Sequence, residues 1–158
     1  MRYLFGFMCV LALGVVGCGE TAAAEESEFP EAEGAAIEAL QIRMQAFNDR
    51  DAEALAAADN YPHARVAQDG SLRVLETPEE FMATYVAVTI PRLEAEGWDH
   101  SEYNSMEVVQ SSANKVHIAF EFSRYDADGN AYLTSRSLYI VTEQDGHWGT
   151  KARSRLSP

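Results

Sequence analysis

The chain has 158 residues, which corresponds to one domain once a leader segment is removed. Its 12 basic and 25 acidic side chains give a formal net charge of −13, and a surface of that sign repels phosphate backbones, so we expect no nucleic-acid partner. A hydrophobic share of 47% suffices for a single buried core without disulfide bonds.

The first segment has the pattern of a secretory signal. Arg2 precedes an apolar run from Tyr3 to Val16, which is too short for a transmembrane helix. The run ends in Val15-Val16-Gly17-Cys18, which resembles the lipobox of bacterial lipoproteins. The resemblance implies that residues 1–17 are a signal peptide, that Cys18 carries lipid, and that several acyl chains hold the protein durably on a membrane.

An acidic spacer follows the lipobox. Residues 19–33 contain six glutamates and no basic side chain, so we expect residues 18–33 to be a lipidated cysteine and a solvated tether. The folded domain is then 34–158, held in the cell envelope and facing the periplasm or the exterior. Because Cys9 would be removed with the leader and Cys18 would be capped, we expect the mature domain to offer no thiol for catalysis or for a metal.

The first half of the domain is predicted to be mainly helical. Apolar residues at three- and four-residue spacing predict a helix over 34–49, and a short helix follows Asp51. Residues 68–71 (Gln-Asp-Gly-Ser) predict a hairpin turn. Thr77 and Pro78 then begin a helix, which Pro91 is expected to kink or end and Gly97 to terminate.

The second half, from about residue 102, alternates as strands do. Turn residues at 111–114, 128–129 and 145–146 join neighbouring strands by short loops, which predicts an antiparallel meander. Even-length loops would turn Phe120, Ser137 and Ala152 toward the same interior.

This interior face has aromatic walls, small residues in its middle and Arg124 at one end. Such a face leaves a hollow of the kind that binds small molecules, unless helix residues such as Met44, Phe81 or Tyr85 fill it. On the opposite face, Tyr132, Leu138 and Ile140 are apolar and indicate a partner surface, which a second copy of the chain could cover.

The order of the elements resembles that of SnoaL-like domains in the nuclear-transport-factor-2-like superfamily. The first helix leading into Ala46-Phe47-Asn48-Asp49-Arg50-Asp51, and the ending 137–142 (Ser-Leu-Tyr-Ile-Val-Thr) with Asp145-Gly146 and Trp148, carry this resemblance. It implies an α+β, cystatin-like fold in which a cone-shaped, curved antiparallel sheet wraps around three helices. Members include ketosteroid-isomerase-like enzymes, cyclases, hydrolases and non-catalytic binding modules.

Two residues are candidates for a general base. The resemblance places His63 at the pocket mouth, where its imidazole could accept a proton or orient a ligand. Glu107 would face the pocket only if the loop at 111–114 is even, whereas hydrophobicity favours Met106 and Val108 on that face. Arg124 could bind an anionic group or pair with a carboxylate.

Three functions follow from these observations. The first is a lipid-anchored domain that binds a small, partly apolar ligand without turning it over; the second is a cyclase, isomerase or hydrolase that uses His63 or Glu107; the third is an interaction module that uses the outer sheet face. The histidines show no metal-ligand spacing and the sequence has no nucleotide-binding motif, so we expect neither metal nor cofactor. The predicted ligand-binding residues are Tyr61, His63, Tyr85, Phe120, Phe122, Arg124, Ser137, Tyr139 and Trp148.

Overall fold

A computed structural model describes residues 27–156 of the chain. The predicted signal peptide, Cys18 and most of the predicted tether lie outside the described residues. Within residues 27–156, no helix is both long enough and apolar enough to cross a membrane.

Helix α1 (Pro30–Asn48) begins four residues before the predicted domain boundary. Pro30 stands in the first turn, where its fixed φ suits a helix and its missing N–H is not needed. The last residues of the predicted tether are therefore helical. A short helix α2 (Ala52–Ala57) follows as predicted, and the Asp51 carboxylate caps it by accepting from the Ala54 N–H at 2.9 Å.

The predicted hairpin is formed by β1 (Asp59–Val66) and β2 (Leu72–Leu75). Helix α3 (Pro78–Thr84) comes next, and the Thr77 hydroxyl caps it by accepting from the Glu80 N–H at 3.3 Å. This confirms the predicted helix start, in which Pro78 occupies the first turn.

Pro91 does not end this helical segment. A π-helical stretch, η1 (Tyr85–Thr89), directly precedes α4 (Ile90–Ala95), and the Ile90 N–H bonds to the Tyr85 carbonyl. A wider turn of this kind accommodates a proline that lacks an N–H and crowds the preceding turn. The helix ends at Gly97, as predicted, with a positive φ of 77°.

Four long strands complete the chain: β3 (His100–Ser112), β4 (Lys115–Tyr125), β5 (Ala131–Gln144) and β6 (His147–Leu156). They form the predicted antiparallel meander. The six-stranded sheet has the order β2-β1-β6-β5-β4-β3. Strand β1 pairs with β6 in parallel, and the sequence did not predict this pairing.

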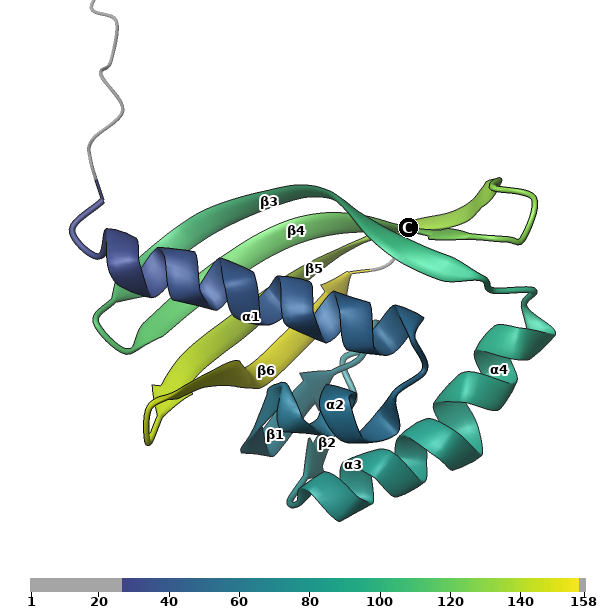
Figure 1. Cartoon of the computed structure of the whole chain (residues 1–158), viewed down its shortest axis with the longest axis horizontal. Helices are drawn as coiled ribbons and strands as arrows, with labels where there is room; N and C mark the ends of the chain where they lie inside the picture. Colours follow the sequence, from purple (N-terminus) through teal and green to yellow (C-terminus); the bar gives the residue numbers. More distant parts are fainter. Residues whose placement is uncertain (1–26, 157–158) are drawn as a thin grey trace, which may run out of the picture.

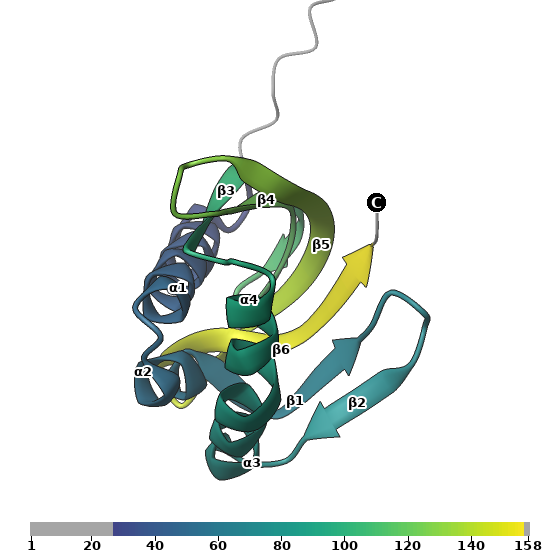
Figure 2. The ribbon, with the colours of Figure 1, turned by 90° about the vertical axis from the view of Figure 1, so that its right-hand side faces the viewer.

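The sheet curves around the helices, as the α+β prediction requires. Figure 1 shows α1 lying across the long strands and the α3–η1–α4 segment at one side; Figure 2 shows the curvature from β4 and β5 to the β1–β2 hairpin. One core cluster joins α1 to β4 and β5 through Leu40, Ile118 and Val141. A second joins α2 and α3 through Leu55 and Phe81.

The registers confirm most of the predicted interior face and correct one part of it. Phe120 pairs with Ser137, and both are buried. Between β5 and β6 the register shifts by one residue, so Ile140 pairs with Ala152 and Tyr139 pairs with Arg153. Ala152 therefore shares the outer face with Ile140, and Arg153 and Arg155 take the interior positions that we expected Ala152 and Ser154 to occupy.

Candidate functional site

A hollow lies between the two core clusters. It encloses about 570 Å³ of empty space, a figure that includes solvent at its open mouth. Helix residues Met44, Phe81 and Tyr85 form part of its wall without closing it. The lining comprises Arg43, Met44, Phe47, Leu55, Arg65, Phe81, Tyr85, Thr89, Ser101, Tyr103, Phe120, Phe122, Arg124, Tyr139 and Arg153.

Most of this wall is aromatic or aliphatic. The rings of Phe120 and Tyr139 meet edge to face with centroids 4.7 Å apart, and Phe122 lies 6.2 Å from Phe120. From the other side, Phe81 and Tyr85 stack at 6.2 Å. The hollow therefore offers apolar surface from both the sheet and the helices.

The polar part of the wall is basic. Four arginines line the hollow, and no acidic side chain of residues 27–156 does. Arg43 projects from α1 and is only 7% exposed; its Nε–H donates to the Asp59 carboxylate at 2.7 Å. Burial opposes the charge of Arg43, but the Asp59 carboxylate outweighs burial and raises the pKa of Arg43.

Arg124, at the end of β4, also has a carboxylate partner. Its Nη1 donates to Glu96 at 3.1 Å, and Glu96 ends α4, so this ion pair ties the helix to the sheet. The Nε atom of Arg124 is buried and has no hydrogen-bond partner among the described residues. Burial and the nearby Arg92 charge lower the pKa of Arg124.

The other two arginines stand side by side. Arg65 of β1 lies directly opposite Arg153 of β6 in the parallel pair. The Arg65 guanidinium lies 4.7 Å from the centroid of the Phe81 ring, and Nη1 of Arg153 donates to the Tyr139 hydroxyl at 3.4 Å. Within residues 27–156, no ion pair at 4 Å or less involves either side chain.

The surroundings of Arg65, Tyr103 and Tyr139 change the pKa values of these three side chains. Burial, and the adjacent charges of Arg153 and Arg43, lower the pKa of Arg65 to about 9. Burial raises the pKa of Tyr103. Burial acts in the same direction on Tyr139, but the charges of Arg43 and Arg153 outweigh it and lower the pKa of Tyr139. An anion on this wall would meet strong positive potential.

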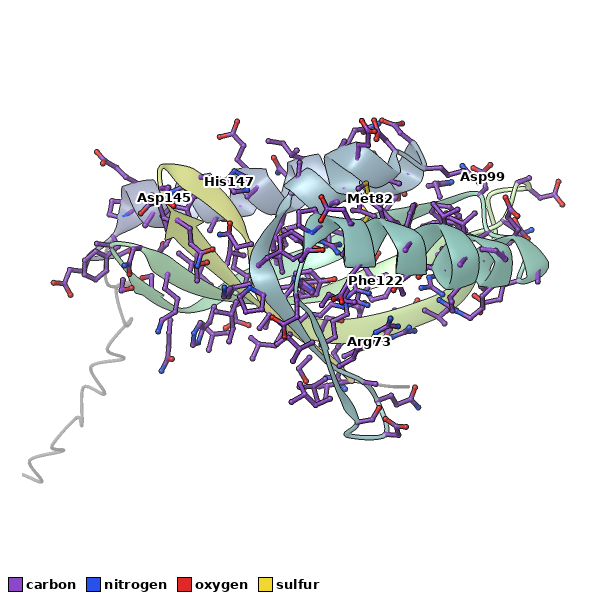
Figure 3. The ribbon with its side chains drawn as sticks, turned by 90° about the horizontal axis from the view of Figure 1, so that it is seen from below. Arg73, Met82, Asp99, Phe122, Asp145 and His147 are labelled. Atoms are coloured by element: carbon purple, nitrogen blue, oxygen red, sulfur yellow. The ribbon has the colours of Figure 1, made fainter. Side chains whose placement is uncertain are left out.

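Five of the nine predicted ligand-binding residues line this hollow: Tyr85, Phe120, Phe122, Arg124 and Tyr139. Tyr61, His63, Ser137 and Trp148 do not. The Tyr61 hydroxyl donates to the Ala56 carbonyl at 3.0 Å, and Ser137 is buried opposite Phe120. Seen from below in Figure 3, Phe122 lies near the middle of the molecule, whereas Asp145 and His147 mark the β5–β6 turn at one end; Trp148 directly follows that turn.

Neither of the two candidate bases lines the hollow. His63 is 0% exposed; its Nδ1–H donates to the Thr150 carbonyl at 2.9 Å, and Asp59 lies 3.6 Å away. Burial lowers the pKa of His63 to about 4, against the opposing charge of Asp59. Glu107 is exposed on the outer face, and Met106 and Val108 pair with Phe120 and Ile118 on the inner one, as hydrophobicity predicted.

Sequence reasoning missed Arg43, Arg65 and Arg153. Arg43 lies three residues after Leu40 and four before Phe47, which is a position on the buried face of α1. Arg65 alternates with buried His63 along β1, so strand periodicity places both on one face. No sequence pattern indicates that Arg153 lies on the inner face, because the face that its side chain takes depends on the bulge near Lys151.

Outside the hollow, the outer sheet face exposes Tyr132 and Leu138 at 37% and 36%. Its use as a partner surface stays a prediction. No cluster of three or more possible metal ligands (His, Cys, Asp or Glu) occurs within the described part of the chain.

The chain is similar to a known protein family in sequence and to solved structures in fold. A family model described as "NTF2-like protein (DUF6841)" matches residues 33–152. No curated protein matches the chain in sequence. Among solved structures, an NTF-2-like protein of unknown function from Shewanella oneidensis is 16% identical, with a TM-score of 0.63 over 79% of this chain and 98% of that one.

Two further structures support the fold. An NTF2-like protein with a cystatin-like fold from Novosphingobium aromaticivorans is 13% identical, with a TM-score of 0.66 over 81% of this chain and 82% of that one. A ketosteroid isomerase-like protein from Erwinia carotovora atroseptica is 21% identical, with a TM-score of 0.58 over 82% of this chain and all of that one. At these identities the likeness concerns the fold alone. Since the family model matches most of the folded part, the chain belongs to the NTF2-like family DUF6841.

Proposed function

We propose that the domain binds a small, partly apolar molecule in the hollow and releases it unchanged. The observation that carries this proposal is the composition of the wall, in which aromatic rings surround an open space and the described residues contribute no carboxylate or imidazole. Histidine and the carboxylates are the side chains that most often serve as general acid or base, and such a group acts only within reach of the substrate. His63 and Glu107 do not line the space, so the arrangement favours binding over turnover.

A larger side chain in the wall of the hollow tests this proposal. Thr89 lines the hollow, whereas its neighbour Val88 is 58% exposed and does not. The panel consists of benzoate, phenylacetate and hexanoate with their three amides, each added at millimolar concentration while thermal unfolding is followed. We expect at least one compound to raise Tm in the wild type and in the control Val88→Trp, but not in Thr89→Trp.

The recovered compound should be unchanged both in mass and in its NMR spectrum, because an isomerase would alter only the second. If no member of the panel raises Tm, or if Thr89→Trp responds like the wild type, the hollow is not a binding site. Conversion of a compound during incubation would favour the enzymatic alternative.

We further propose that Cys18 holds this domain on a membrane surface of the cell envelope. The support is the sequence pattern at Val15-Val16-Gly17-Cys18 together with the acidic residues that follow it. A tethered domain with an open hollow would meet its ligand outside the cytoplasm.

A further inference from the structure

The arginines of the hollow are not balanced by carboxylates. Two of the four have acidic partners, since Arg43 binds Asp59 and Arg124 binds Glu96. Arg65 and Arg153 have no ion pair within the described residues. Because the chain has 25 acidic and only 12 basic side chains, we would expect each arginine to have a carboxylate partner.

The placement of Arg65 and Arg153 is costly to the folded protein. They occupy directly opposite positions on neighbouring strands, which lie about 4.8 Å apart in a sheet. Like charges in such positions destabilise a sheet, and partial burial increases the cost. A negative group between the two guanidiniums would remove the repulsion.

One donor of this pair has no acceptor. The Nε atom of Arg65 is buried and has no hydrogen-bond partner within the described residues. A guanidinium presents its Nε–H and Nη–H groups as a fork that matches the two oxygens of a carboxylate. A buried N–H without an acceptor, such as that of Arg65, is expected where a ligand supplies the acceptor when it binds.

The surrounding wall restricts the ligand to an organic anion. Arg153 contacts Tyr139, whose ring packs against Phe120, and Phe122 continues the same wall. Inorganic phosphate would leave these rings without a partner, whereas an aromatic or alkyl carboxylic acid would cover them.

We propose that the hollow takes a small organic carboxylate, with its oxygens between Arg65 and Arg153 and its apolar body against Phe120 and Phe122. This inference rests on the proposed function and adds the charge and the chemical class of the ligand.

The test compares matched acids and amides. Titration calorimetry measures the affinities of benzoate, phenylacetate and hexanoate, of their three amides, and of inorganic phosphate. We expect at least one acid to bind about tenfold or more tightly than its amide, because hydrogen bonds to charged groups are the stronger ones. Phosphate should bind more weakly than that acid.

Substitutions of Arg153 and Arg65 test whether the carboxylate of the bound acid lies between them. Arg153→Gln and Arg65→Gln should each lower affinity for that acid about tenfold or more and leave affinity for the amide within about twofold. The matched control is Arg136→Gln, which removes the same charge from the exposed outer face of β5 and should change neither affinity. Arg153→Lys, which keeps the charge but loses the fork, should retain intermediate affinity.

Thermal unfolding without any ligand gives an independent readout. If Arg65 and Arg153 repel each other, Arg153→Gln raises Tm while it weakens acid binding, and Arg136→Gln leaves Tm unchanged. A lower Tm together with unchanged acid binding in Arg153→Gln would overturn the inference by showing that the arginine only supports the fold.

The outcomes separate the two proposals. Acids and amides that bind equally well, with no effect of either arginine variant, would overturn the carboxylate inference and keep the binding function. Phosphate binding as tight as that of the best acid would also overturn it. If no acid and no amide binds, both proposals fall.

Discussion

At the scale of single residues, the structure concentrates buried charge around Asp59. The Asp59 side chain is 0% exposed, and its carboxylate accepts from Arg43 and lies 3.6 Å from His63. Such a group is expensive to bury, and it is tolerated because partners surround it. Removing one partner should therefore cost far more than removing a charge from the surface.

Asp59→Asn is expected to lower the free energy of unfolding by about 3–5 kcal/mol, because Arg43 would stay buried without its counter-charge. Chemical denaturation measures this change. The control is Asp99→Asn, whose partner His100 is at the surface, and it should shift stability by about 0.5 kcal/mol or less. Equal effects of the two substitutions would contradict the buried-pair interpretation.

His63 should make the fold sensitive to acid. Its pKa of about 4 in the folded protein lies below the 6.5 of an unperturbed ring, so between these values the unfolded chain binds a proton that the native state does not. Stability is therefore expected to fall as pH decreases through this window, by at most about 3 kcal/mol. Denaturant midpoints measured from pH 7 to pH 4 test this.

The comparison uses two glutamine variants. His63→Gln should flatten the stability profile between pH 6.5 and pH 4, relative to the wild type. His117→Gln, on the outer face of β4, should leave the slope unchanged. A wild-type slope that persists in His63→Gln would assign acid sensitivity to other groups.

At the scale of elements, the ends of the helices depend on local chemistry that the sequence makes visible. Thr77 caps a helix where we expected a cap, and Asp51 caps the short helix that we expected to follow it. Gly97 ends the third helical segment with a φ that other residues adopt at a cost. The π-helical stretch before Pro91 was not predicted, because a proline can kink, end or be absorbed by a helix according to its tertiary packing.

Gly97→Ala should lower the free energy of unfolding by about 1–2 kcal/mol, since a Cβ is disfavoured at a φ of 77° even though no atom lies within 4 Å of it. Gly34→Ala is the matched control, because Gly34 is exposed inside α1 and equally free of neighbours. That substitution should raise stability by about 0.5–1 kcal/mol. Opposite signs in urea denaturation would confirm the backbone argument, and equal signs would refute it.

Much of the fold followed from the sequence, because local signals agreed along the chain. The apolar periodicity around Leu40, the turn glycines and the strand alternation at 115–125 each specified an element and a face. The parallel β1–β6 contact did not follow, since it joins residues about 90 positions apart and has no local signature. Arg153 was missed because one bulge in β6 exchanges Ala152 for Arg153 on the inner face. Arg43 and Arg65 were missed although helix and strand spacing place them on inner faces.

At the scale of the whole molecule, the predicted anchor and the folded part make separate contributions. The domain folds around its own two core clusters. The segment that contains Cys18 would determine only where the domain resides. A substitution at Cys18 should therefore change localisation without changing the fold.

Cys18→Ser should abolish incorporation of labelled palmitate and move the protein from the detergent phase to the aqueous phase in Triton X-114 partitioning, because a serine cannot form the thioether to lipid. Circular dichroism and Tm of the domain should stay those of the wild type. Cys9→Ser, within the predicted leader, is the control and should still be labelled. Labelling of Cys18→Ser would rule out lipid attachment at this residue.

The acidic chain and its basic hollow have one more consequence, which concerns kinetics. An organic anion that approaches a molecule of net charge −13 is repelled at long range and attracted only near the arginines. Added salt should screen the repulsion over distances beyond about 10 Å at 0.1 M while affecting the partly buried contacts less. The association rate of a carboxylate should consequently increase with ionic strength, which is the reverse of ordinary electrostatic steering, and large polyanions should be kept away from the mouth.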